Sequence, residues 1–98
     1  MTIVLGDIGG TNARLAFSNS DSDGLKEPKI FNCIDFPTIE DLLTHYCKIS
    51  GISPNSLSLA VAGPVLDDLV KLTNGNWEFS KQKIMKNFKL DRAVFIND

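Results

Sequence analysis

The sequence contains few of the residues that build metal centres or disulfide frameworks. Its 98 residues include only two cysteines and one histidine. Neither Cys33, in an expected strand, nor Cys47, in an expected helix, has a histidine or a further cysteine at metal-ligand spacing. We therefore interpret both as buried, reduced thiols, which are typical of a reducing compartment.

The chain also has no excess of charge of one sign. Ten basic and twelve acidic residues leave a formal net charge of -2, so no global field attracts nucleic acid or an anionic membrane. The densest basic stretch consists of Lys81, Lys83, Lys86 and Lys89, which we interpret as the solvated face of a surface helix. No nucleic-acid partner is expected.

Long hydrophobic runs are absent as well. The first residues, MTIVLGD, lack the basic start and the long apolar stretch of a signal peptide. No apolar run approaches the ~20 residues of a membrane span, so we expect a cytoplasmic protein without a membrane partner. The composition, 43% hydrophobic and 22% charged, is that of an ordinary globular domain, and the length allows one domain or part of one.

Hydrophobic patterns predict a series of strands. The expected strands are Thr2–Ile8, Asn12–Ser18, Lys29–Phe36, Leu57–Ala62, Val65–Leu72 and Ala93–Ile96, with a loop at residues 19–28 and a turn at residues 73–76. The first run is nearly all apolar, which is typical of a strand inside a sheet rather than at its edge. The second run alternates and is expected to pair with the first as a hairpin.

Two stretches have helical periodicity. Thr38, with Asp41 three residues later, predicts the start of a helix that ends at Gly51. Its inward-facing residues are expected to be Ile39, Leu42, Leu43, Tyr46 and Ile49. Ser80 predicts the cap of a short second helix, with Ile84, Met85 and Phe88 facing inward. The order of these elements predicts an α/β fold with a partly parallel sheet.

The sharpest local signal is a strand that ends in an acidic residue and runs directly into a Gly-Gly-Thr turn. It consists of Gly6, Asp7, Ile8, Gly9, Gly10, Thr11 and Asn12. Glycines let a phosphate approach the backbone N–H groups, and Thr11 and Asn12 add side-chain donors. Asp7 suits a magnesium ion held mainly through water. An ordinary hairpin turn explains the same spacing, and spacing alone favours it.

This turn matches neither of the common phosphate-binding motifs. No helix follows it, as the dinucleotide fingerprint requires, and no lysine lies in it, as the Walker phosphate loop requires. Neither of those mechanisms is therefore transferred to this chain.

Asn97-Asp98, at the end of the last expected strand, is the second candidate. A carboxylate there can accept a proton from a substrate hydroxyl, and the amide can hold neighbouring hydroxyls. The pair alone is more often a turn or a helix cap. Because open α/β sheets bind ligands at the carboxyl ends of their strands, Asp7 and Asp98 are expected at the same edge.

Three further features are given structural interpretations. His45 has no acidic or thiol partner nearby in sequence and is expected at the surface or its boundary. Trp77 is expected to anchor a loop. Asp67-Asp68 is interpreted as a turn rather than a metal pair, because adjacent residues of a strand point to opposite faces.

Four stretches together resemble the bacterial glucokinase family, within the actin-like ATPase and sugar-kinase superfamily. They are Gly6–Leu15, Ala60–Val65, Leu72–Asn74 with Trp77 and Ser80, and Ile96–Asp98. The resemblance implies that residues 1–98 are the N-terminal, ribonuclease-H-like lobe of a two-lobe sugar kinase, ending at its last strand. The resemblance further implies that this lobe has a mixed five-stranded sheet and flanking helices. A related group of repressors and kinases usually has lysine after the threonine, where this chain has Asn12.

The resemblance also implies an activity, the transfer of the γ-phosphoryl of ATP to the 6-hydroxyl of glucose with Mg²⁺. The hairpin from Gly6 to Asn12 then binds the ATP phosphates, Asp7 holds the metal, Asp98 is the general base, and Asn97 and Asp98 bind the sugar. In the family a second lobe completes the site, so the chain alone is expected to be inactive. The alternative is a noncatalytic sugar- or nucleotide-binding regulator of the same superfamily. Whether the full-length protein is a homodimer is left open.

Overall fold

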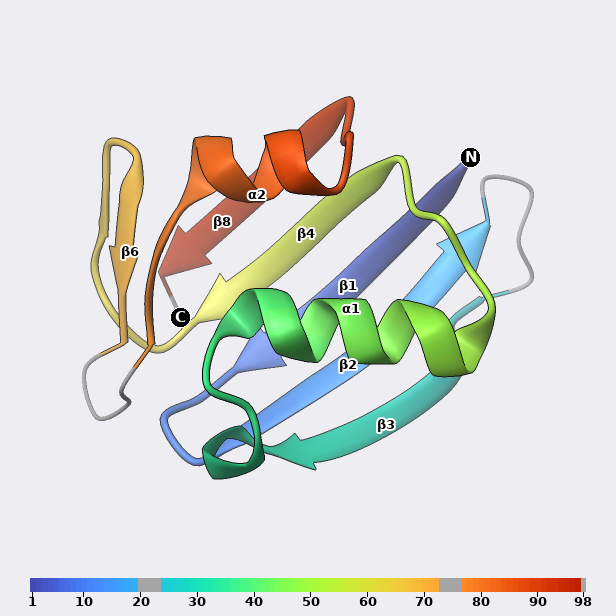
Figure 1. Ribbon diagram of the computed structural model, residues 1–98, viewed down its shortest axis with the longest axis horizontal. Coiled ribbons are helices and arrows are strands. Elements are labelled where there is room, and N and C mark those ends of the chain that lie inside the picture. The colour runs from blue at the N-terminus through green and yellow to red at the C-terminus, as the bar shows by residue number, and fades with distance from the viewer. Residues whose placement is uncertain (20–23, 73–76, 98) are drawn as a thin grey trace.

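The computed structural model describes residues 1–19, 24–72 and 77–97, which form two sheets, two α-helices and one short 3-10 helix (Figure 1). The larger sheet has the order β3-β2-β1-β4-β8. Its strands are β1 Thr2–Ile8, β2 Asn12–Asn19, β3 Lys26–Asn32, β4 Ser56–Val61 and β8 Arg92–Asn97. Strands β1, β4 and β8 are parallel, whereas β2 is antiparallel to β1 and β3. The expected α/β fold with a mixed five-stranded sheet is confirmed.

The remaining elements lie beside this sheet. They are η1 Cys33–Asp35, α1 Ile39–Ser50, α2 Lys81–Asn87 and a three-stranded sheet of β5 Val65–Leu66, β6 Leu69–Lys71 and β7 Glu78–Ser80. Both α-helices cover the same face of the larger sheet (Figure 1). Neither is long and apolar enough to cross a membrane, and no other described segment forms such a helix.

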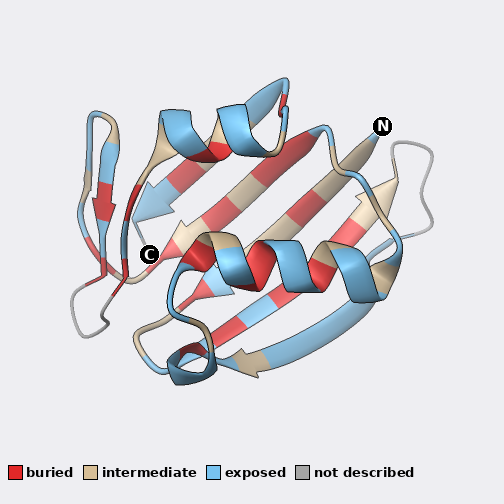
Figure 2. Cartoon of the chain, viewed as in Figure 1, coloured by how far each residue is buried: buried red, intermediate tan, exposed pale blue. Residues whose placement is uncertain are grey.

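The hydrophobic core lies between the larger sheet and the two α-helices. Figure 2 shows buried positions on alternate strand residues and on the sheet-facing sides of the helices. Fully buried side chains include Val4, Ile8, Leu42, Tyr46 and Ile84. Burying one such aliphatic side chain contributes about 1.5–3 kcal/mol, so this layer accounts for much of the stability. No helix among the described residues covers the opposite face of the sheet.

Helix α1 begins and ends where its sequence predicts. The Thr38 hydroxyl oxygen accepts a hydrogen bond from the Asp41 N–H at 3.1 Å, which satisfies one of the free donors of the first turn. Gly51 ends the helix in the left-handed conformation, with φ of 68°, where a side chain would be strained. Only the inward orientation of Ile49 is wrong, since its side chain is 48% exposed.

The third strand differs from the expected Lys29–Phe36. It starts at Lys26, inside the expected loop, and stops at Asn32, where the chain turns into η1. Asn32 pairs with Asn12, the first residue of β2. Beyond that pair β2 offers no backbone for a longer ladder, so the expectation of a strand over residues 33–36 was wrong.

The expected strand Val65–Leu72 is instead the hairpin of β5 and β6. Asp67 has a positive φ of 41°, a conformation that short polar side chains tolerate. The interpretation of Asp67-Asp68 as a turn is confirmed. Strand β7, which the sequence did not indicate, pairs with β6. The expected turn at residues 73–76 lies outside the described residues.

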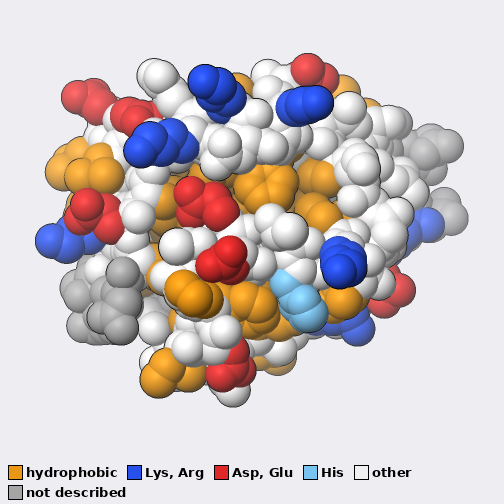
Figure 3. All heavy atoms as spheres, in the orientation of Figure 1, with side chains coloured by type: hydrophobic (Ala, Val, Ile, Leu, Met, Phe, Trp, Pro, Cys, Tyr) orange, Lys and Arg blue, Asp and Glu red, His pale blue; other side chains and the backbone are white. Residues whose placement is uncertain are grey.

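The structure also places His45, Trp77 and the basic stretch from Lys81 to Lys89. His45 is exposed and lies against the rings of Phe31 and Phe36, with centroids 5.9 and 5.5 Å away. Trp77 is 4% exposed and donates from Nε1 to the Phe36 carbonyl at 3.0 Å, so it anchors its segment as expected. Lys83, Lys86 and Lys89 are exposed and Lys81 is half-buried. Figure 3 shows acidic and basic side chains interspersed on the helix-covered face.

Helix α2 begins at Ser80 as predicted, with an additional cap from the β5–β6 turn. The Ser80 hydroxyl accepts from the Lys83 N–H at 3.2 Å and donates to the Asp68 carboxylate. The other Asp68 oxygen accepts from the Gln82 N–H at 2.8 Å. The hydrogen bond from Ser80, followed by that from the Gln82 N–H, lowers the pKa of Asp68. The turn therefore holds α2 through a charged carboxylate.

The variant Asp68→Asn tests this cap. The pKa of Asp68 is lowered in the folded protein, so the charged carboxylate stabilises the fold at pH values above the ordinary pKa of aspartate. This contribution to stability is lost as the pH falls through the lowered pKa. We expect a lower Tm for Asp68→Asn near neutral pH, and a smaller difference from the wild type below about pH 4. A difference that stays constant over this range, measured by circular dichroism, would contradict the charged cap.

Candidate active site

The Gly-Gly-Thr turn joins the central strand β1 to its neighbour β2, at the carboxyl end of β1. Asp7 is the second-last residue of β1 and pairs with Arg14 of β2. The Gly9 N–H donates to the Asn12 carbonyl at 2.9 Å and closes the hairpin. A surface hollow of about 380 Å³ lies over it, lined by Asp7, Gly9, Gly10, Thr11, Asn12 and Arg14. The structure therefore brings five of the seven predicted hairpin residues together around one space.

In the backbone of the turn, carbonyl oxygens accept hydrogen bonds from the fold, whereas two N–H groups have no acceptor among the described residues. The carbonyls of Gly9, Thr11 and Asn12 each accept a hydrogen bond from within the fold. The N–H groups of Gly10 and Thr11 have no acceptor in the part of the chain that the structure describes. Successive free N–H groups form an anion-binding concavity. The turn is thus suited chemically to phosphate oxygens.

The two other predicted residues, Gly6 and Ile8, lie behind this space. Ile8 is fully buried in the core. A Cβ on Gly6 would lie 2.6 Å from Leu15 Cδ2 and 2.7 Å from Leu59 Cδ2, so the glycine leaves room for core packing. Both residues support the turn from the helix-covered side, and neither lines the hollow.

Arg14 is a site residue that the sequence analysis missed. Because Asp7 and Arg14 are register partners, their side chains share a face of the sheet, opposite to that of the buried Ile8. Both side chains are exposed. Counting residue pairs outward from the Gly-Gly turn would have placed this cation opposite Asp7. The hollow thus combines one carboxylate, one guanidinium and neutral donors.

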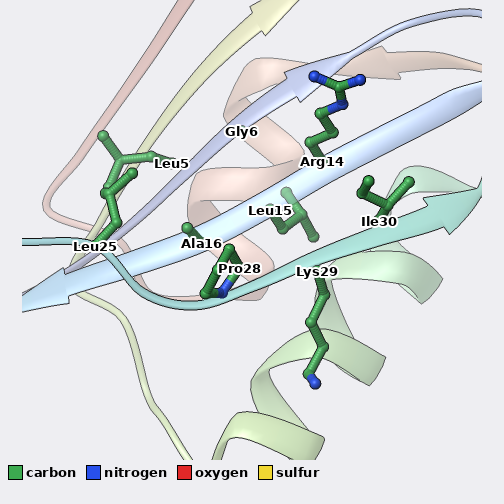
Figure 4. Close-up of a pocket in the computed structure, with 9 residues that line it drawn as sticks. All are labelled: Leu5, Gly6, Arg14, Leu15, Ala16, Leu25, Pro28, Lys29 and Ile30. Carbon is green, nitrogen blue, oxygen red and sulfur yellow. The ribbon is translucent and has the colours of Figure 1, made fainter.

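Arg14 also borders a second, mostly apolar hollow on the open face of the sheet (Figure 4). This hollow has a volume of about 470 Å³ and lies between β1, β2 and the start of β3. Its apolar lining includes Leu5, Ala16, Leu25, Pro28 and Ile30. Leu25 and Ile30 are 63% and 66% exposed. An apolar surface therefore continues directly from the Gly-Gly-Thr hairpin.

Asn97 lies at the same edge of the sheet as Asp7. Strand β4 separates β1 from β8, with Asp7 in register with Ala60 and Ala60 in register with Ile96. Asn97 follows Ile96 and is exposed. Two strand spacings put the backbones of β1 and β8 about 10 Å apart. Asp98 lies outside the described residues, so its expected place at the edge of Asp7 stays a prediction, whereas Asn97 lies at that edge.

The one acidic residue of the hairpin, Asp7, suits one kind of metal ion. Among the described residues, no group of three or more His, Cys, Asp and Glu side chains could hold a metal. Asp7 alone does not make a structural metal site. It does fit Mg²⁺ that arrives with phosphate groups, because this ion keeps several waters and needs only one or two carboxylates.

Sequence comparison assigns the chain to a known family. The sequence model described as Glucokinase matches residues 4–98. Curated relatives include glucokinases from Colwellia psychrerythraea, 37% identical over 97 residues, and Saccharophagus degradans, 35% identical over 99 residues. These alignments cover 97% of this chain but 29% and 31% of the relatives. The chain thus spans less than a third of the length of these proteins.

Solved structures support the same assignment. A glucokinase from an Antarctic psychrotroph has a TM-score of 0.89 and 33% identity, over 99% of this chain and 32% of that chain. A ROK family glucokinase from Streptomyces griseus, in complex with glucose and AMPPNP, has a TM-score of 0.67 and 20% identity, over 99% of this chain and 33% of that chain. At that identity it shows the fold alone. The expected actin-like ATPase fold is confirmed.

The family match extends over almost the whole sequence, and the motif residues Asp7, Gly9 to Asn12 and Asn97 lie along one edge of the sheet. Fold, motif positions and sequence similarity agree, and the chain is a member of the glucokinase family.

Proposed function

We propose that the chain is the N-terminal lobe of a two-lobe glucokinase, and that the complete protein transfers the γ-phosphoryl of ATP to the 6-hydroxyl of glucose. The observation that supports this most directly is the turn at Gly9–Asn12, where the N–H groups of Gly10 and Thr11 have no acceptor among the described residues and lie next to an exposed carboxylate. An anion cradle beside a Mg²⁺-compatible carboxylate is what phosphoryl transfer from a nucleotide needs.

Each residue then has a defined task. The amides of Gly10 and Thr11, with the side chains of Thr11 and Asn12, hold phosphate oxygens. Asp7 would hold Mg²⁺ through water, and the ion would supply neutralisation of the phosphate charge. We assign the proton-accepting role to Asp98 and the holding of neighbouring sugar hydroxyls to Asn97, both from the family resemblance. Positioning and electrostatics therefore provide most of the catalysis.

Exposed apolar side chains on the open face of the sheet support the proposal of a larger protein. They include Leu25, Ile30 and Ile96. The chain covers only about 30% of the length of its relatives. Exposed apolar surface of this kind marks a contact site. We propose that the second lobe supplies the adenosine pocket and the remaining sugar contacts, so that residues 1–98 alone do not turn over. The cytoplasm, where ATP is available, is the proposed location. Homodimerisation stays a prediction.

The decisive experiment is a coupled assay of ADP production by the complete protein, with glucose and a panel of other hexoses. We expect ADP formation that depends on glucose and Mg²⁺, with turnover in the range of about 1–100 per second. If the protein binds sugar or nucleotide but releases no ADP with any hexose, the regulator alternative replaces the enzyme.

A further inference from the structure

One residue outside the hairpin contacts both sides of its turn. Cys33 is the first residue of η1 and is 8% exposed. Its backbone N–H donates to the Thr11 carbonyl at 2.8 Å, and its thiol donates to the Gly9 carbonyl at 3.4 Å. These two carbonyls flank Gly10. The segment that follows β3 therefore holds the turn through a single residue.

The bonds from Cys33 affect the electrostatics of the turn. Carbonyl oxygens repel phosphate oxygens, whereas N–H groups attract them. Cys33 engages the carbonyls of Gly9 and Thr11, and the Gly9 N–H engages that of Asn12. The N–H groups of Gly10 and Thr11 are left without an acceptor among the described residues. The backbone conformation that offers donors to an anion is thus the one in which Cys33 is bonded.

The thiol is in the protonation state that this contact requires. Burial raises the pKa of the Cys33 thiol above its ordinary value, so the sulfur keeps the proton that it donates. A thiolate would repel the Gly9 carbonyl, and a cysteine of this kind is a poor nucleophile. The surroundings therefore favour a positioning role over a reactive one.

We propose that Cys33 is a positioning residue for nucleotide binding, which holds the Gly9–Asn12 turn in the conformation that presents the Gly10 and Thr11 amides to ATP phosphates. The inference rests on the proposed function, because it requires that the turn bind ATP. Cys47 is a natural control. It is half-buried in α1, and no hydrogen bond joins it to the turn in the described part of the chain.

The test compares Cys33→Ala, Cys33→Ser and Cys47→Ala in the complete protein, by steady-state kinetics and by calorimetric binding of Mg·AMPPNP. Cys33→Ala removes the side-chain donor but keeps the backbone N–H. We expect its KM for ATP and its Kd for Mg·AMPPNP to rise about twofold to tenfold, the range of one hydrogen bond. The KM for glucose and kcat should stay within about twofold of the wild type, since neither depends on that bond.

The conservative variant separates positioning from general stability. The hydroxyl of Cys33→Ser can donate to the same carbonyl, so its KM for ATP should return to within about twofold of the wild type, as should that of Cys47→Ala. An unchanged KM and Kd in Cys33→Ala, or equal rises in the KM for ATP and for glucose, would overturn the inference while leaving the proposed function intact. A wild-type protein that neither binds Mg·AMPPNP nor releases ADP would overturn both.

Discussion

Replacement of Asp98 by asparagine in the complete protein is expected to lower kcat for glucose phosphorylation by about 10²–10⁴-fold, the usual contribution of a general base. Asparagine has nearly the same shape as aspartate, but its amide cannot accept the proton of the sugar 6-hydroxyl. Glucose binding should change much less, because the amide oxygen still accepts a hydrogen bond. Steady-state kinetics and the Kd for glucose, measured by intrinsic fluorescence, check both parts.

Asp91→Asn provides the matched control for this variant. Asp91 is exposed and precedes the first residue of β8, at the opposite end of the strand from Asn97. The same chemical change there should leave kcat within about twofold of the wild type. If Asp98→Asn keeps more than a tenth of the wild-type kcat, Asp98 is not the general base.

The second large effect is expected for Gly63→Ala, in the turn between β4 and β5. Gly63 is buried, and a Cβ there would lie 2.0 Å from the Lys71 carbonyl oxygen and 2.9 Å from the Leu72 Cα. Both are backbone atoms, so no side-chain rotation relieves the clash, and β6 would have to move. We expect a loss of at least about 3 kcal/mol in the free energy of unfolding, seen as a large fall in Tm or as insoluble protein.

Gly51→Ala is the control for Gly63→Ala. Gly51 has a φ of 68° but open space around its Cβ position, so alanine there carries only the strain of the left-handed conformation, about 1 kcal/mol. The two variants share one chemical change and differ in the space around it. Equal losses of stability at the two positions would show that the close approach of the Lys71 carbonyl is not what requires Gly63.

The elements predicted well from the sequence are those whose signals are local. The bounds of β1 were predicted as observed, because the apolar run and the glycine turn lie within the same few residues. Helix α1 was predicted from its cap at Thr38 and its stop at Gly51. The Gly-Gly-Thr hairpin was located correctly for the same reason.

The errors arose where distant parts of the chain decide the local structure. The end of β3 depends on where β2 begins, since Asn32 is the last residue with a partner strand. Within Val65–Leu72, residues 69–71 form a separate strand that pairs with β7 at residues 78–80, and Asp68 accepts a hydrogen bond from Gln82, 14 residues away. Single-sequence periodicity contains neither fact.

The same distinction applies to the candidate site. The hairpin residues could be identified from their types and order, but the contact between Cys33 and the Gly9 carbonyl spans 24 residues and follows no motif. Arg14 could have been found by extending the hairpin register from Gly9-Gly10, because its pairing with Asp7 follows from a tight turn. Long-range supporting contacts therefore need the structure, whereas register across the hairpin does not.

The most direct test is a crystal structure of the complete protein with AMPPNP, Mg²⁺ and glucose. The account predicts phosphate oxygens within hydrogen-bond distance of the Gly10 and Thr11 amides, a magnesium-bound water on the Asp7 carboxylate, and the glucose 6-hydroxyl next to Asp98. Nucleotide phosphates bound elsewhere, with the Gly9–Asn12 turn in contact with solvent alone, would contradict it.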